Sequence, residues 1–511
     1  MTDTTTEGVV GGLEHADADA AAETHIDRAL LAVASVVVLG TIMSILDTTV
    51  VNVAINTLAV RFHTTLPTIQ WVATGYTLAL AAVIPLTGWI ADRFGTKRLY
   101  MISIALFLCG SALSGLAWSA GSIIAFRVLQ GLGGGMIMPA GMTILTRAAG
   151  PQRIGRVMSI IGVPMLLGPI LGPILGGWLV ADVSWRWIFF INVPIGIVAL
   201  FLALRILPRD VAAHDQKLDL VDFLLLSPGL ALMIYGLAET NGSGGFGSPK
   251  VIVPLLAGIA LLAVFVWHSL RASDPLIDLR LFKDRTFAMS SVMLVLVVIS
   301  VFGSFLLLPL YFQAVRGESA LQAGLLLAPQ GLGAMLAMPM AGMLSDRTGP
   351  GKIVPFGLLA IIAAVLWLTQ IGAHTSYVAT SIALFVFGAG MGFTMMPTFS
   401  GAMQTLRREA VARGSTVLNI LQQTGASIGT AVLTVILASA LTSRLGGGGS
   451  IGSSAQLTPA MRAHVAPLMA DAFGYTFWWA LGLLVVAFAF STMLPKRKPA
   501  NATAGAPIPL A

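Results

Sequence analysis

One segment of this chain occurs twice, first as Gly88-Trp-Ile-Ala-Asp92-Arg93-Phe-Gly95-Thr-Lys97-Arg98 and again, 254 residues later, as Gly342-Met-Leu-Ser-Asp346-Arg347-Thr-Gly349-Pro-Gly-Lys352. Two more pairs of similar segments are separated by nearly the same number of residues. The run that ends at Pro139 matches the run that ends at Pro397, and Arg153-Ile-Gly155 matches Ala412-Arg413-Gly414. Self-similarity at a fixed shift indicates an internal repeat, so the chain is predicted to consist of two similar halves.

The composition indicates whether these halves lie in water or in a membrane. Of the 511 residues, 56% are hydrophobic and 10% charged, whereas an average soluble chain is about 25% charged. Apolar runs of about 20 residues recur, the length of helix that crosses the hydrocarbon core of a bilayer, and the short alternating strands of a membrane barrel are absent. We predict an all-α polytopic membrane protein with fourteen spans, near 29–56, 68–91, 98–117, 121–146, 154–180, 185–207, 219–238, 250–270, 286–313, 320–344, 352–372, 376–404, 411–440 and 473–494.

The repeat and the spans together divide the chain into five segments. Two pseudo-symmetric six-helix bundles are predicted over 29–207 and 286–494, with two extra linker helices between them over 208–285. The segment 1–28 is polar and acidic and lacks the positive leader of a signal peptide, so it is predicted to be a disordered cytoplasmic tail. A second cytoplasmic tail is expected over 495–511.

The distribution of positive charge predicts the orientation in the membrane. With the N-terminus inside, the cytoplasmic segments carry 22 of the 29 Lys and Arg residues, and the outer segments carry six. This asymmetry satisfies the positive-inside rule, so we expect a multi-pass protein of the plasma (inner) membrane, embedded in the lipid bilayer with both termini in the cytoplasm. The rule accounts for the net charge of +7, and no basic patch for nucleic acid is left. The sole cysteine, Cys109, excludes an internal disulfide.

Two charged residues are predicted to lie deep in the membrane. Asp47 lies about nine residues from the outer end of the first span and Arg127 about six from the outer end of the fourth, so at about 1.5 Å per residue their depths differ by roughly 5 Å and they can meet in one cavity. A charge at the centre of a bilayer costs about 2.5–3.5 kcal/mol and usually marks a proton or ion pathway. Asp47 and Arg127 are therefore candidates for proton coupling. A static ion pair for Asp47 and a structural donor to backbone carbonyls for Arg127 are the alternatives.

Several motifs resemble signatures of one family. The Gly88–Arg98 segment looks like the loop 2–3 signature of the major facilitator superfamily, and Arg127-Val-Leu-Gln130-Gly131 resembles the helix 4 signature of its proton-driven members. The run Gly168-Pro169-Ile-Leu-Gly172-Pro173-Ile-Leu-Gly176-Gly177 resembles its helix 5 antiporter signature. Two further runs, Leu46 to Ile55 and Trp185 to Pro194, resemble signatures of the fourteen-helix drug:proton antiporter branch, the EmrB/QacA type.

This resemblance covers almost the whole chain and implies a major facilitator fold and a function. It implies a proton-coupled antiporter that exports hydrophobic or amphiphilic compounds by alternating access, driven by the proton gradient without a cofactor or metal. The expected partners are protons and hydrophobic small-molecule substrates; a monomer is expected, and a periplasmic adaptor is left open. An exporter of an endogenous lipid or metabolite is the main alternative. A membrane enzyme, a channel or a sensor is disfavoured, because the sequence has no metal-spaced His/Cys cluster, P-loop or nucleophile elbow.

The fifth predicted span, near 154–180, carries the first group of candidate gating residues. Gly168, Gly172 and Gly176 repeat every four residues and allow another helix to approach closely. Pro169 and Pro173 remove backbone donors and favour bending, and Gly177 extends the thin surface. The expected partner is the tenth predicted span, near 320–344, with Gly324, Gly331 and Gly333. A bent packing helix without a gating role is the alternative.

The loop after helix 2 carries the second group. Asp92 lies about one helical turn after Gly88, next to Arg93 and Gly95. An anion there can interact with the positive end of a facing helix, and the helix that begins near Arg413 is the expected partner. This contact would close the cytoplasmic gate. Ordinary topogenic charge is the alternative for the basic residues.

The sequence indicates the residues of the substrate cavity less clearly than the charged and gating residues. In a transporter of two repeats, the substrate site lies between the halves. By analogy between the halves, the first, fourth, ninth and twelfth predicted spans should surround it, with the second, fifth, tenth and thirteenth at its flanks. Flexible methionines suit varied hydrophobic guests. Some multidrug members of the family that the motifs resemble carry additional acids in the later spans, whereas the spans near 320–344 and 411–440 carry amides here, and the resemblance therefore does not favour dicationic drugs. Neutral or monocationic lipophiles are therefore expected. The candidate contacts are Asn52, Gln70, Tyr76, Gln130, Met136, Tyr311, Gln313, Gln330, Met395, Met396, Asn419, Gln422 and Gln423.

Overall fold

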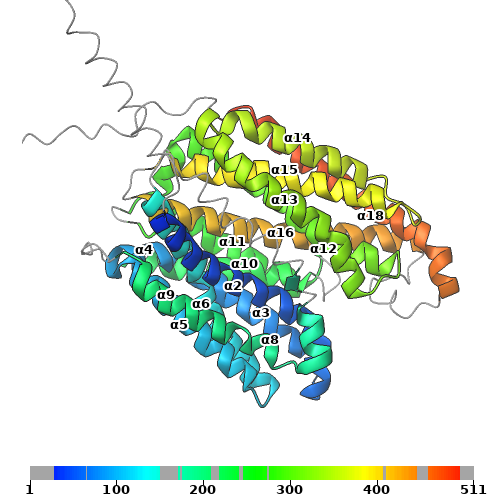
Figure 1. The fold of residues 1–511 in the computed structure, drawn as a ribbon, viewed down its shortest axis with the longest axis horizontal. Helices are drawn as coiled ribbons and strands as arrows, with labels where there is room; N and C mark the ends of the chain where they lie inside the picture. Colours follow the sequence, from blue (N-terminus) through cyan, green and yellow to red (C-terminus); the bar gives the residue numbers. More distant parts are fainter. Residues whose placement is uncertain are drawn as a thin grey trace, which may run out of the picture.

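The regular elements of the described chain are all helices. The computed structural model describes residues 28–64, 66–149, 171–172, 175–208, 218–240, 246–272, 275–404, 406, 410–445 and 459–494. Both expected tails lie outside it, except for Arg28, which begins the first helix. Figure 1 labels the helices. The longer ones are α2 (Arg28–Arg61), α3 (Leu66–Val83), α4 (Leu86–Phe94), α5 (Thr96–Gly115), α6 (Ala120–Ala149), α9 (Asn192–Ile206), α10 (Leu220–Glu239), α11 (Pro249–Ser269), α12 (Arg285–Ala314), α13 (Ala320–Thr348), α14 (Pro350–Leu368), α15 (Tyr377–Gln404), α16 (Val411–Leu445) and α18 (Pro459–Ser491). Three short elements complete them: η1 (Leu179–Val183), α8 (Trp187–Phe190) and η2 (Leu279–Lys283).

Most of these helices are long and apolar enough to cross a membrane. The described residues contain 12 such helices, or 13 if the bent pair of α3 and α4 forms one span. The pair bends by 54° at Pro85, which has no backbone N–H to continue the helix. The predicted fifth span, near 154–180, lies mostly outside the described residues, so the total of fourteen spans stays a prediction.

The helices gather into two groups. In the first, α2 packs against α6 and α9, while α3 and α5 pack on α6. In the second, α12 packs on α16 and α18, and α13 and α14 pack on α15. Figure 1 shows that the groups converge near α4 and diverge toward the opposite end. The linker helices α10 and α11 pair with each other, and α10 also contacts α3 and α16, so the linker pair touches both groups.

The repeated segment of the sequence has the same backbone conformation in both groups. Gly95 joins α4 to α5 with a φ of 94°, and Gly349 joins α13 to α14 with a φ of 85°. Glycine adopts such positive φ values without a steric penalty. The same tight turn thus follows the same Asp-Arg pair in each half of the chain.

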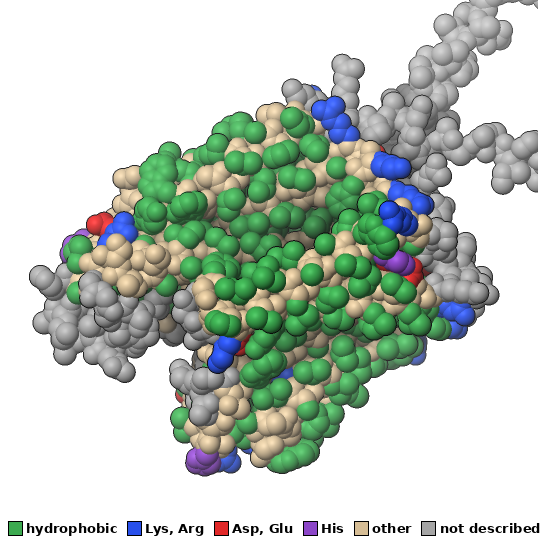
Figure 2. Space-filling model, turned by 180° about the vertical axis from the view of Figure 1, so that it is seen from behind, with side chains coloured by type: hydrophobic (Ala, Val, Ile, Leu, Met, Phe, Trp, Pro, Cys, Tyr) green, Lys and Arg blue, Asp and Glu red, His purple; other side chains and the backbone are tan. Residues whose placement is uncertain are grey.

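The outside of the molecule suits a lipid environment. Figure 2 shows a surface covered largely by apolar side chains, with most Lys and Arg side chains near its ends. Large apolar residues such as Val253 and Phe356 are each 65% exposed. An apolar surface of this extent is too large for a soluble monomer and matches the apolar composition of the chain.

Candidate functional site

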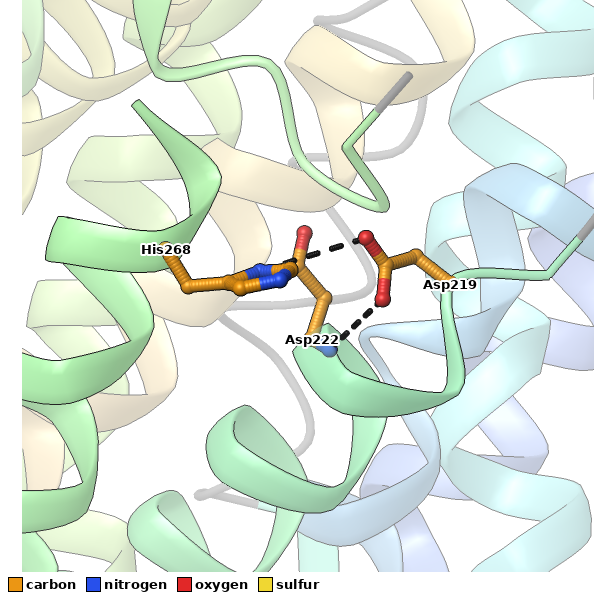
Figure 3. A group of neighbouring side chains, drawn as sticks. All are labelled: Asp219, Asp222 and His268. Atoms are coloured by element: carbon orange, nitrogen blue, oxygen red, sulfur yellow. Dashed lines mark hydrogen bonds and ion pairs between the residues drawn. The ribbon is translucent and has the colours of Figure 1, made fainter. Parts of the chain in front are cut away.

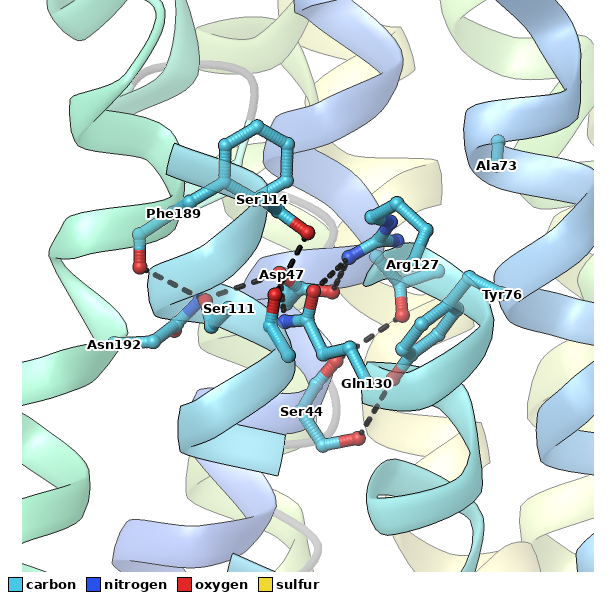
Figure 4. A network of polar contacts seen from close by, with 12 residues as sticks. Ser44, Asp47, Ala73, Tyr76, Ser111, Ser114, Arg127, Gln130, Phe189 and Asn192 are labelled. Atoms are coloured by element: carbon cyan, nitrogen blue, oxygen red, sulfur yellow. Dashed lines mark hydrogen bonds and ion pairs between the residues drawn. The ribbon is translucent and has the colours of Figure 1, made fainter. Parts of the chain in front are cut away.

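A buried ion pair lies inside the first helix group. Asp47 on α2 and Arg127 on α6 are each 1% exposed, and Arg127 Nη1 lies 2.5 Å from Asp47 Oδ2 (Figure 4). The structure therefore brings together the two intramembrane charges that the sequence places at similar depths. A buried pair is tolerated when additional hydrogen bonds satisfy its remaining polar atoms.

Two side-chain amides complete the surroundings of the Asp47 carboxylate. Gln130 on α6 donates from Nε2 to Oδ1 at 2.8 Å, and Asn192 on α9 donates from Nδ2 to the same oxygen at 3.2 Å. Arg127, Gln130 and Asn192 all act as hydrogen-bond donors to this carboxylate. Because an ionised carboxylate only accepts, whereas a protonated one must also donate, the arrangement fits the ionised form of Asp47.

The guanidinium of Arg127 is held from several directions. Its Nε donates to the Val72 carbonyl of α3 at 3.1 Å, and its Nη1 also donates to Gln130 Oε1 at 2.8 Å. The ring of Tyr76 lies 4.1 Å from the guanidinium carbon, and the Tyr76 hydroxyl is 3.3 Å from Ser44 Oγ. A planar guanidinium can make these contacts at the same time, whereas an ammonium cannot.

Glycines of α6 bring this helix close enough for the network to form. A Cβ on Gly131 would overlap the Tyr76 carbonyl of α3, and a Cβ on Gly133 would overlap the Phe107 backbone of α5. Both glycines lie in the Gly-rich run that follows Gln130. The close packing fixes the position of α6, and with it the two side chains that α6 contributes to the network.

The network includes two of the predicted cavity residues and one residue that was not predicted. Tyr76 and Gln130 are buried beside the ion pair, and their contact with substrate stays a prediction. Asn192 was not among the candidate site residues, although it lies in one of the motifs. Its signal in the sequence is a single amide within the apolar run Ile188-Phe-Phe-Ile-Asn192-Val.

A second polar cluster joins the two helix groups at the end that carries Asp92. The hydroxyls of Thr143 on α6 and Ser415 on α16 are 3.1 Å apart. The Asp92 carboxylate lies 3.5 Å from Arg147 Nη2 and 3.9 Å from Arg413 Nε. Asp92 thus faces cations from both groups, including the residue near which the sequence places its partner helix.

The other candidates in this segment support the turn around Asp92. Gly88 and Gly95 are buried, while the Arg93 side chain is half-buried. The backbone N–H of Gly95 donates to the Ala91 carbonyl and closes α4. Their predicted role in gating stays a prediction.

The predicted partnership of the span near 154–180 with the span near 320–344 stays a prediction, because only a small part of the first span is described. Gly172 and Gly176 are buried and face Thr49 and Val50 of α2, whereas Gly333 of α13 faces α15. A Cβ on Gly177 would meet open space. Rows of small residues allow close packing against any neighbour, so they do not identify the partner. Gly168, Pro169 and Pro173 lie outside the described residues.

The remaining cavity candidates fall into three groups. Gln70 and Gln313 are exposed, and Gln422 and Gln423 are half-buried. The buried ones include Tyr311, whose hydroxyl donates to the Gly372 carbonyl at 2.7 Å, a bond that indicates packing within the second group. Also buried are Met136, Gln330, Met395, Met396 and Asn419. The side chain of Asn52 lies outside the described part of the chain.

A polar cluster that the sequence analysis did not select anchors the linker helices. Asp222 in the first turn of α10 is fully buried; its Oδ1 lies 2.8 Å from His268 Nδ1 of α11, and its Oδ2 accepts the Leu276 N–H at 2.9 Å. Asp219 caps α10 by accepting from two backbone N–H groups, and its Oδ2 lies 3.9 Å from the same imidazole nitrogen (Figure 3). Asp222 therefore ties both linker helices to the segment that leads into η2 and α12.

Asp222→Ala is expected to lower the free energy of unfolding by about 1–3 kcal/mol, because the buried partners of the carboxylate lose their acceptor. Thermal unfolding of the purified protein in detergent measures the change. Asp182→Ala, at an exposed aspartate of η1, is the matched control. Equal unfolding temperatures for the two variants would show that the cluster is not an anchor.

Two groups of membrane-spanning helices that share a repeated sequence segment, with a buried ion pair inside one of them, are typical of membrane transporters. The model of the Major Facilitator Superfamily matches residues 37–430, and the chain belongs to this family. Family membership makes it a transporter and not an enzyme, and confirms the resemblance found in the motifs.

Named relatives refine this assignment. The chain is 42% identical over 497 residues to the multidrug resistance protein B homolog of Mycobacterium tuberculosis, across 93% of this chain and 92% of that protein. It is 31% identical over 399 residues to the multidrug export protein EmrB of Haemophilus influenzae, across 78% of each. The solved structure of the human organic anion transporter MFSD10 shares the fold, with a TM-score of 0.57 and 16% identity over 89% of this chain and 99% of that one. The chain is thus a facilitator-family transporter related to multidrug efflux proteins.

Proposed function

We propose that this transporter is a proton-coupled antiporter that exports hydrophobic or amphiphilic compounds by alternating access. The observation that carries the proposal is the buried Asp47 carboxylate, surrounded by Arg127, Gln130 and Asn192 as donors. A buried ionisable residue inside a transporter bundle usually marks a proton or ion pathway. The relatives named for multidrug resistance and multidrug export support drugs as the exported compounds.

Asp47 carries the proton in this mechanism. Desolvation favours the neutral form of a carboxyl group, and a neighbouring cation favours the ionised form. A displacement of Arg127, or the arrival of a substrate, therefore changes which form is stable. Proton uptake weakens the bonds that hold α2 to α6 and α9. Because α6 also contacts α16 through Thr143 and Ser415, the change reaches the contact between the two helix groups.

Asp92 holds the cytoplasmic gate closed in the described conformation. Its carboxylate lies between Arg147 of the first group and Arg413 of the second. Opening toward the cytoplasm must break the contact with Arg413, while the contact with Arg147 can persist within one group. The described conformation is then outward-facing, in agreement with the divergence of the helix groups away from this end (Figure 1).

We further propose fourteen spans, with the segment near 154–180 as the additional one, and both termini in the cytoplasm of a monomer in the plasma membrane. The two ends of α5 test this orientation. In a Cys109→Ser background, Ser119→Cys is expected to react with an impermeant thiol reagent in intact cells, and Phe94→Cys only after the membrane is opened. Both positions are exposed. Labelling of Phe94→Cys in intact cells would reverse the proposed topology.

Export is expected to stop when the proton gradient is dissipated, because substrate movement is proposed to be coupled to proton entry. Accumulation of lipophilic fluorescent dyes in inverted vesicles, with and without a protonophore, measures this dependence. Vesicles from cells that lack the protein are the control for passive dye partitioning. Accumulation above that control at zero proton-motive force would contradict proton coupling.

A further inference from the structure

Asn192 connects Asp47 to helices that contribute no charge to the ion pair. Its Nδ2 lies 3.2 Å from Asp47 Oδ1 and 3.1 Å from Ser111 Oγ. Asn192 is 1% exposed and Ser111 is fully buried. Asn192 belongs to α9 and Ser111 to α5, whereas the ion pair joins α2 to α6 (Figure 4).

Ser111 fixes the direction of the Asn192 amide. The Ser111 hydroxyl donates to the Phe189 carbonyl at 2.9 Å, so its oxygen presents lone pairs to Asn192. The NH₂ group of a side-chain amide has two N–H donors. One points to Ser111 and the other to Asp47, so Asn192 acts on this carboxylate as a donor.

We infer that Asn192, oriented by Ser111, is a positioning residue that holds the ionised form of Asp47 and thereby sets the pH at which this carboxyl group takes up its proton. The inference rests on the proposed role of Asp47 in proton coupling. A donor that bonds to the charged form stabilises that form over the neutral one, so its loss favours protonation.

The other groups around the carboxylate make the contribution of Asn192 separable. Among the described residues of the helices packed against α2, Arg127 of α6 and Tyr76 of α3 are the titratable groups that face Asp47. The neighbouring α8 and α9 contribute Asn192 and no charged side chain at this depth. A substitution of Asn192 therefore removes a hydrogen bond and leaves the cation in place.

The pH at which Asp47 takes up its proton can be measured without a substrate. Infrared difference spectroscopy of the purified full-length protein follows the carbonyl stretch of a protonated carboxyl group, and subtraction of the Asp47→Asn spectrum assigns the band. Asn192→Leu keeps the number and branching of the side-chain heavy atoms and removes the donor. It is expected to move the midpoint of this band to higher pH by about one unit, the size of one hydrogen bond to a charged group.

Two serines of α5 provide a second variant and its control. Ser111→Ala frees the Asn192 amide and is expected to move the midpoint in the same direction by less. Ser114 is equally buried but donates to Gly110 of its own helix, so Ser114→Ala is expected to leave the midpoint unchanged. Midpoints of Asn192→Leu and Ser111→Ala that match Ser114→Ala, or that move to lower pH, would overturn the inference. Failure of the proposed function is a different result, because dye export by the unmodified protein would then persist without a proton gradient.

Discussion

Asp47→Asn is expected to abolish proton-coupled export while the protein still folds and inserts. The substitution keeps the size of the side chain and one acceptor oxygen for Arg127 or Gln130, but it removes the group that binds and releases a proton. Arg127 keeps the Val72 carbonyl, Gln130 Oε1 and the Tyr76 ring as partners. The loss of its anion should therefore lower stability less than the removal of Arg127 does, and the protein should still reach the membrane. Dye accumulation in inverted vesicles, normalised to protein amount, measures the loss.

The exposed Asp182 offers a matched control, because Asp182→Asn removes the same charge outside the network. It should leave both the rate of export and its pH dependence unchanged. If Asp47→Asn exports dye against a gradient at the normal rate and with the normal pH dependence, Asp47 is not the coupling site.

Arg127→Met is expected to lower the free energy of unfolding by about 3–5 kcal/mol and to abolish export. Methionine fills part of the space, but the Asp47 carboxylate then stays buried without its cation. Breaking a buried ion pair from one side destabilises proteins by about this amount. Thermal unfolding in detergent measures the loss of stability.

The double variant Asp47→Asn/Arg127→Met separates this effect from a packing defect. With the carboxylate absent, Arg127→Met should cost much less, so the two substitutions are expected to be strongly non-additive, as residues in direct contact usually are. An equal loss of stability in both backgrounds would show that Arg127 acts through Tyr76 and Val72 rather than through Asp47. Arg127→Lys, which retains the charge and loses the planar fork, should preserve more stability than Arg127→Met but not normal export.

The sequence predicts the helices and the ion pair because both follow from position along the chain. The length of an apolar run determines whether it can cross a membrane, and the depths of Asp47 and Arg127 follow from the rise per residue. The rotation of a helix about its axis does not follow from such counting. For this reason the bond of Gln130 to Asp47 was not predicted, and Asn192 was missed.

Packing partners were harder to predict than depths. The glycines of the span near 154–180 and those of α13 both allow a neighbouring helix to approach closely. Their spacing alone therefore does not distinguish α2 from α13 as the neighbour of Gly172. The burial of Asp222 was also hidden in the sequence, because a carboxylate near the start of a helix ordinarily reaches solvent or a cap. Its partners, His268 and Leu276, come from segments that lie more than 40 residues away in the chain.

The linker pair gives one flank of the transporter an outer layer. Since α10 touches α3 of one group and α16 of the other, the pair covers the boundary between the groups on that flank. A lipophilic compound that moves laterally out of the bilayer there meets α10 and α11 before it reaches the boundary.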